Sequence, residues 1–225
     1  KIPRKYLGGI CKIGIPTAIQ GMAYCVISMV LTRMISVFGA EAVATQRVGG
    51  QIESVSWNTA DGFAAALNAF VGQNYGAGEM KRVKKGYRAS LWTVGVWGVL
   101  IMLSFIIFPE PIARIFFQEP KAIATAVGYL VIIGFSEAFM CVELTTIGAL
   151  SGLGKTRLCS IISITFTAMR VPVAVLLSRT VLGLNGIWWT ITVTSVVKGI
   201  LFVITFLWLT GKHGKKEADR IAVCK

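Results

Sequence analysis

Few charged residues, a single histidine and scattered cysteines exclude several classes of protein. Charged residues make up 15% of the 225 residues, whereas a soluble domain carries about 25%. His213 is the only histidine and the five cysteines form no CxxC pair, so no metal site is expected. The sequence has no Ser–His pair and no HExxH motif. We therefore predict that the protein is not an enzyme and has no catalytic residue.

Apolar residues fill the chain in long blocks. They make up 55% of the residues, and the mean hydropathy is +0.70. A bilayer core about 30 Å thick needs roughly 20 apolar residues per helix. We therefore predict an all-α membrane protein with six transmembrane helices and no soluble fold. The predicted helices cover residues 10–37, 43–73, 87–108, 122–151, 157–178 and 186–210.

Basic residues lie in alternate connections between these blocks. The net charge is +13, and lysine and arginine gather at the N-terminus, in the second and fourth connections and in the tail. These segments share one side of the membrane, which the positive-inside rule identifies as the cytoplasm. We predict a multi-pass protein of the cell membrane with both termini in the cytoplasm. Since the charge lies in loops rather than along one folded surface, nucleic-acid binding is not expected.

Prolines and glycines mark helix ends. Pro109, Pro111 and Pro120 predict a loop after the third helix. The run ALSGLGKT, residues 149–156, loosely fits a phosphate-binding loop, but it follows an apolar helix rather than a strand. We interpret this run as the end of the fourth helix.

A line of polar residues runs along one face of the second predicted helix. The spacings of 4, 3, 4, 3 and 7 residues place its members within about 100° of the helix circumference. The members are Arg47, Gln51, Ser54, Asn58, Asp61 and Asn68. A one-sided polar helix in a membrane is expected to line a wet cavity, although a polar seam between packed helices is the alternative. Glu53 lies about 120° off this line, and its role is open.

Polar residues in the other helices extend this prediction. The cavity is expected to include Gln20, Tyr24, Trp57, Arg170 and Lys198. Six helices around a polar interior indicate a transporter or a channel. The aromatic residues offer stacking or cation–π contacts to a flat organic substrate.

Three acids are the candidates for binding a cation or a proton. They are Asp61, Glu143 and Glu53. A carboxylate removed from water takes up a proton or a metal cation more readily. The alternative is structural pairing of these acids with arginine or lysine.

Three segments resemble the multidrug and toxic compound extrusion (MATE) family. They are KIGIPTAIQ (12–20), GFAAALNAFVGQNYGAGEMKRVKKG (62–86) and ELTTIGALSGLGKTR (143–157). They stand in the family's order, and the resemblance extends over the whole chain. Of their elements, VGQ-x-x-GAG is the most specific.

The resemblance implies a fold and a function. MATE proteins have twelve helices in two six-helix lobes and export organic, often cationic, compounds in exchange for Na⁺ or H⁺. This chain resembles the C-terminal lobe, at residues 10–210, after an inter-lobe linker at 1–9 and before a basic cytoplasmic tail at 211–225. The expected partners are small organic substrates, the lipid bilayer and the missing N-terminal lobe. No cofactor is expected apart from the coupling ion.

The chain departs from the family at two positions. Some members carry a glutamate where this chain has Tyr24 and an aspartate where it has Met140. Coupling is therefore assigned to Asp61 with Glu143 or Glu53, or to the missing lobe. Two alternatives stay open: a lobe that is inert alone, and a lipid-linked saccharide flippase on a related fold. The flippase would use Arg47, Arg170 and Lys198 to bind pyrophosphate.

Overall fold

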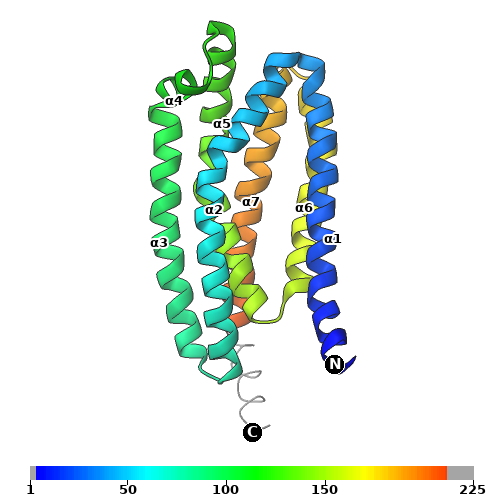
Figure 1. The fold of residues 1–225 in the computed structure, drawn as a ribbon, viewed down its shortest axis with the longest axis vertical. Helices are drawn as coiled ribbons and strands as arrows, with labels where there is room; N and C mark the ends of the chain where they lie inside the picture. The colour runs from blue at the N-terminus through cyan, green and yellow to red at the C-terminus, as the bar shows by residue number, and fades with distance from the viewer. Residues whose placement is uncertain (1–3, 212–225) are drawn as a thin grey trace.

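The structure, a computed structural model, describes residues 4–211 and is almost entirely helical. The basic tail predicted from the sequence lies outside the described residues from position 212 onward. The helices are α1 (Arg4–Ile35), α2 (Ala40–Gly76), α3 (Met80–Ile107), α4 (Pro109–Phe116), α5 (Pro120–Gly152), α6 (Thr156–Ser178) and α7 (Gly183–Thr210), with a 3₁₀ turn at Ser36–Phe38 (Figure 1).

Six of these helices are long, and they correspond to the six predicted from the sequence. Within the described residues, five helices are long and apolar enough to cross a membrane. The sixth, α2, runs beside them over a similar length (Figure 1), but Arg47, Glu53 and Asp61 interrupt its apolar residues. The molecule is an all-α membrane protein in which one of the long helices is markedly more polar than the others.

The short helix α4 corrects the prediction of a loop after the third helix. Pro109 is its first residue and Pro111 lies in its first turn, where a missing backbone N–H breaks no helical hydrogen bond. Ala113 is fully buried, and Arg114 pairs with Glu110 on the exposed side. The prolines therefore start a helix here instead of preventing one.

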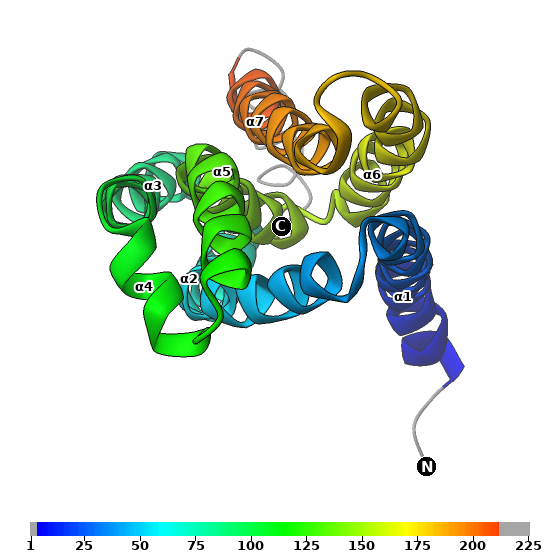
Figure 2. The same cartoon turned by 90° about the horizontal axis from the view of Figure 1, so that it is seen from above.

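Helix α5 lies at the centre of one group of helices. It packs against α2, α3 and α7, while α1 pairs with α6, and α6 joins α7 (Figures 1 and 2). Glycines permit the close contacts of α5. A Cβ added to Gly98 on α3 would lie 2.8 Å from Ala138 Cα, and one added to Gly199 on α7 would lie 2.7 Å from the Phe139 carbonyl oxygen.

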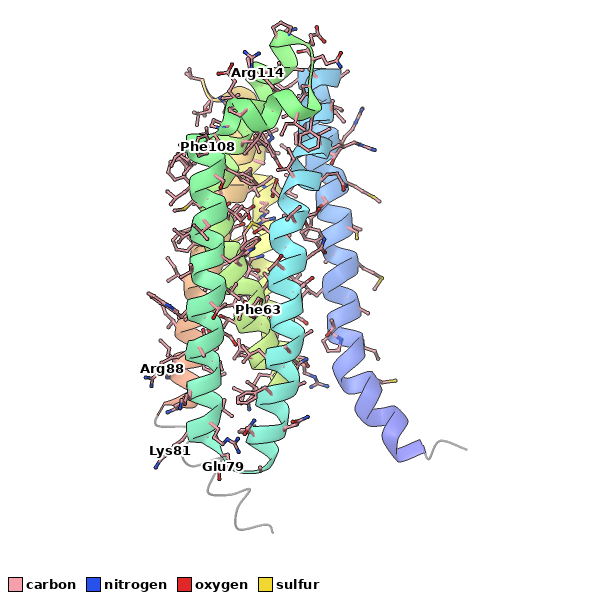
Figure 3. The ribbon with its side chains drawn as sticks, turned by 60° about the vertical axis from the view of Figure 1, so that its left-hand side comes forward. Phe63, Glu79, Lys81, Arg88, Phe108 and Arg114 are labelled. Carbon is pink, nitrogen blue, oxygen red and sulfur yellow. The ribbon has the colours of Figure 1, made fainter. Side chains whose placement is uncertain are left out.

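The two ends of the bundle differ in charge. Lys81, Arg88 and Glu79 lie at one end, and Phe108 and Arg114 lie at the other (Figure 3). The α2–α3 and α5–α6 connections are both at the first end, and the α1–α2 and α6–α7 connections are at the second (Figure 1). The basic connections therefore share one end, as their alternation along the sequence predicted.

Candidate functional site

A cavity of about 450 Å³ lies between α1, α2, α5, α6 and α7. Its lining combines carboxylates, cations, amides and aromatic rings with aliphatic residues. The charged residues in the lining are Glu53, Asp61, Glu143, Arg170 and Lys198. Within a membrane, burial of a charged group costs free energy, and such groups are retained where they bind a ligand or one another.

The cations of the cavity have partners. Lys198 Nζ lies 2.9 Å from Glu143 Oε1, and both side chains are more than nine-tenths buried. Arg170 donates from Nε to Thr194 Oγ1 at 2.9 Å and from Nη2 to Ser195 Oγ at 2.7 Å. These contacts join α5, α6 and α7 on one side of the cavity.

The acids on α2 and α5 have a different environment. Tyr129 donates its hydroxyl hydrogen to Glu53, and both residues are buried. Glu137 is fully buried. The Ser56 hydroxyl lies near it but contacts Cys141 Sγ at 3.1 Å, and neither carboxylate oxygen of Glu137 has a well-formed hydrogen bond in the described part of the chain. Glu53 and Glu137 are close enough to interact electrostatically. Two acids are thus buried near each other, and among the described residues neither forms an ion pair.

The structure brings many of the predicted site residues together around the cavity. Those in its lining are Gln20, Tyr24, Glu53, Trp57, Asp61, Glu143, Arg170 and Lys198. Of the polar line on α2, only Asp61 is among them. The other members of the line do not contribute to the cavity: Arg47, Gln51, Asn58 and Asn68, which are exposed, and Ser54, which is half-buried.

The polar line is exposed because α5 covers a different side of α2. The buried residues of α2, among them Glu53, Ser56, Ala60 and Ala64, form the side that packs on α5. The polar line lies on the opposite side of the helix. Glu53, which lies off the line, is consequently the acid of α2 that is buried. The functional roles of all these residues stay predictions.

Sequence reasoning did not select Glu137 or Tyr129. Glu137 had a usable signal, because it is an acid inside an apolar span. Tyr129 had none, since one tyrosine in an apolar helix is unremarkable until its hydroxyl partner is known. Among the described residues, no group of three or more histidine, cysteine, aspartate or glutamate residues is placed to hold a metal ion.

Comparisons with known proteins relate the chain to membrane transporters. The family model described as MatE matches residues 16–176. The chain is 32% identical over 213 residues to the probable multidrug resistance protein NorM of Thermotoga maritima, covering 92% of this chain and 45% of that protein. It is 22% identical over 192 residues to the FAD transporter of Shewanella oneidensis, with coverage of 85% and 42%.

The fold has matches among solved structures. The crystal structure of the Vibrio cholerae MATE transporter VcmN in the bent form matches with a TM-score of 0.81 at 20% identity. That match covers 97% of this chain and 49% of the other. The chain therefore spans less than half the length of each of these three proteins.

Proposed function

The chain belongs to the MatE family, and on that premise we propose that it forms one six-helix lobe of a cation-coupled antiporter that exports organic compounds. The observation that carries the proposal is the cavity of about 450 Å³ among five helices. It offers carboxylates and the aromatic rings of Tyr24 and Trp57 to one occupant. An organic cation with a flat ring system suits both kinds of contact.

Coupling to Na⁺ or H⁺ is assigned first to Glu53. Its carboxylate lines the cavity, has a tyrosine donor and lies near a second buried acid, Glu137. Arg170 acts electrostatically on Glu53 but forms no ion pair with it in the described part of the chain. Two buried negative charges near each other are unfavourable, so uptake of a proton or a small cation stabilises this pair of acids. Glu143 is a weaker candidate, because Lys198 already neutralises it. Asp61 lines the cavity from an exposed position and is the second candidate.

The polar line on α2 supports a second lobe as partner. One side of α2 packs against α5 and α3, and the other side leaves four polar residues exposed at the surface of the bundle: Arg47, Gln51, Asn58 and Asn68. Exposure of these groups to lipid is unfavourable, so a polar surface or a water-filled space must face them. In the proposed transporter, the N-terminal lobe lies across this line, and the line forms one wall of the translocation path during alternating access.

Orientation follows from the charged ends. The end of the bundle that carries Lys81 and Arg88 is assigned to the cytoplasm by the positive-inside rule. On this basis we propose that both termini are cytoplasmic and that the chain lies in the cell membrane.

No specific observation favours the saccharide flippase. That function requires basic side chains that are free to bind pyrophosphate. Lys198 is instead paired with Glu143, and Arg170 donates hydrogen bonds to two hydroxyl groups. Arg47 does not line the cavity.

The test is ion-driven efflux by the full-length transporter that contains this chain. Glu53→Gln is expected to abolish uptake of a fluorescent organic cation into proteoliposomes under an imposed Na⁺ or proton gradient. The control is Glu79→Gln, an exposed acid outside the cavity, which should leave transport unchanged.

Two outcomes would redirect or overturn the proposal. Normal transport by Glu53→Gln with loss in Asp61→Asn would move coupling to the exposed acid. Transport of a lipid-linked saccharide by the wild type, with no response to organic cations, would replace the antiporter by the flippase.

A further inference from the structure

A groove on the outside of the bundle has no part in the proposed transport cycle. It lies between α3 and α5, has a volume of about 390 Å³ and shares no residue with the central cavity. Its lining is apolar throughout and includes Trp92, Gly95 and Val99 from α3 and Phe139 and Val142 from α5. A groove of this composition accepts a hydrocarbon chain.

Three basic residues continue the line of the groove along α3. Together with three residues of the lining they form a line with spacings of 4, 3, 4, 3 and 4 residues. The members of this line are Lys81, Lys85, Arg88, Trp92, Gly95 and Val99. This spacing places all six on one face of a helix. The three basic side chains are exposed, and Lys81 and Arg88 project from the end of α3 opposite to Phe108 (Figure 3). A cationic end therefore leads directly into an apolar groove.

Two glycines of α3 explain why the groove is hollow. A Cβ on Gly98 would lie 2.8 Å from Ala138 Cα, so Gly98 brings α3 against α5. A Cβ on Gly95 would meet nothing within 4 Å, so Gly95 leaves open space beside that contact. The groove is thus part of the packing of two helices and does not depend on a mobile side chain.

The dimensions match one leaflet of a bilayer. The α3 lining extends from Leu91 to Leu100, which is about 14 Å of helix at 1.5 Å per residue. Half of the hydrocarbon core is about 15 Å. Trp92, which is 77% exposed, lines the end of the groove that is nearest to the basic residues in the sequence. Tryptophan at this level is typical of the boundary between headgroups and hydrocarbon.

We infer that this face of α3 and α5 is a binding site for an anionic phospholipid, with its phosphate at Lys85 and Arg88 and an acyl chain in the groove. The acid closest in sequence, Glu79, precedes the first residue of α3 and is a single negative charge against three basic residues, so the face stays positive. A zwitterionic lipid brings its own cation to the headgroup and gains less from this face. The site depends on the chain spanning a membrane and does not depend on what the protein transports.

Native mass spectrometry of the purified full-length protein tests the site. The probes are phosphatidylglycerol and phosphatidylcholine with identical acyl chains. Wild-type protein is expected to bind phosphatidylglycerol more tightly. Lys85→Gln/Arg88→Gln should weaken that binding about 30-fold, because each basic residue near a membrane surface contributes about 1 kcal/mol. Gly95→Leu should weaken binding of both lipids, because leucine fills the groove.

The matched control is Arg82→Gln/Arg157→Gln, which removes the same charge from two exposed residues outside the line. This variant should bind phosphatidylglycerol like the wild type. Equal loss in the control would show that overall charge, and not this site, attracts the lipid. Equal binding of the two lipids by the wild type, or unchanged binding by Lys85→Gln/Arg88→Gln, would overturn the inference.

Discussion

Glu143 and Glu137 lie six residues apart on α5, and both are buried, but their surroundings differ. Glu143 has Lys198 at 2.9 Å. Glu137 has no well-formed hydrogen bond in the part of the chain that the structure describes, and it lies near a second acid, Glu53. The same residue type on the same helix is neutralised in one place and left without a cation in the other.

This difference separates two uses of a buried carboxylate. A carboxylate with a buried lysine partner holds helices together, since removal of either partner leaves the other charge without compensation. A carboxylate without a cation is ready to take up a proton or a small cation from outside. We therefore expect the Glu143–Lys198 pair to act on stability and the Glu53–Glu137 pair to act on coupling.

The largest expected effect comes from breaking the Glu143–Lys198 pair. Lys198→Met should lower the free energy of unfolding by about 3–5 kcal/mol, because Glu143 is left buried without its partner. The measurement is SDS-induced or thermal unfolding of the purified full-length protein in detergent micelles.

The double variant Glu143→Gln/Lys198→Met is the control for this effect. It removes both charges and should recover most of the lost stability. If the double variant is as unstable as the single one, lost packing rather than an unpaired charge explains the result, and the comparison between the two acids fails.

The second-largest expected effect concerns Glu53 and its tyrosine donor. Tyr129→Phe removes the hydroxyl that donates to Glu53, and a buried group that loses its hydrogen-bond partner lowers the free energy of unfolding by about 1–3 kcal/mol, with the upper end expected if Glu53 is ionised. Tyr87→Phe is the matched variant, because the buried Tyr87 hydroxyl contacts the neutral Thr146 Oγ1 at 3.0 Å. It should lower the free energy of unfolding by only about 1 kcal/mol. Equal losses in the two variants would show that Glu53 accepts this bond as a neutral group.

The smallest effect lies outside the cavity. Arg114 and Glu110 pair at 2.7 Å on α4, but their side chains are 65% and 57% exposed. Glu110→Gln should change the free energy of unfolding by less than about 0.5 kcal/mol, because water and salt screen exposed pairs. Unfolding at low and high salt measures it. A loss comparable to that of Lys198→Met would mean that burial does not distinguish the two pairs.

Much of the fold could be predicted from local sequence. Apolar blocks of about 20 residues have few structural solutions in a membrane, and the segments at 12–20, 62–86 and 143–157 indicated the MATE family, which the MatE match over residues 16–176 confirms. The short helix α4 was missed, because prolines at a helix start and in a loop look alike in sequence.

The candidate site was only partly predictable. Periodicity showed that α2 has a polar line and that Glu53 lies off it, but periodicity does not say which side of a helix another helix covers. In the structure, α5 covers the side with Glu53, so Asp61 stays exposed. Glu137 was recognisable as an acid in an apolar span, but its lack of a cation partner was not.

The sequence by itself determined that the chain lies in a lipid bilayer, how many long helices it forms and that its basic connections gather at one end. These features depend on composition and spacing along the chain. Only the tertiary structure decided which carboxylate meets a lysine. The ion pair of Lys198 with Glu143 and the hydrogen bond of Tyr129 to Glu53 each join residues at least 55 positions apart. No local pattern records such contacts, because helix packing alone brings their partners together.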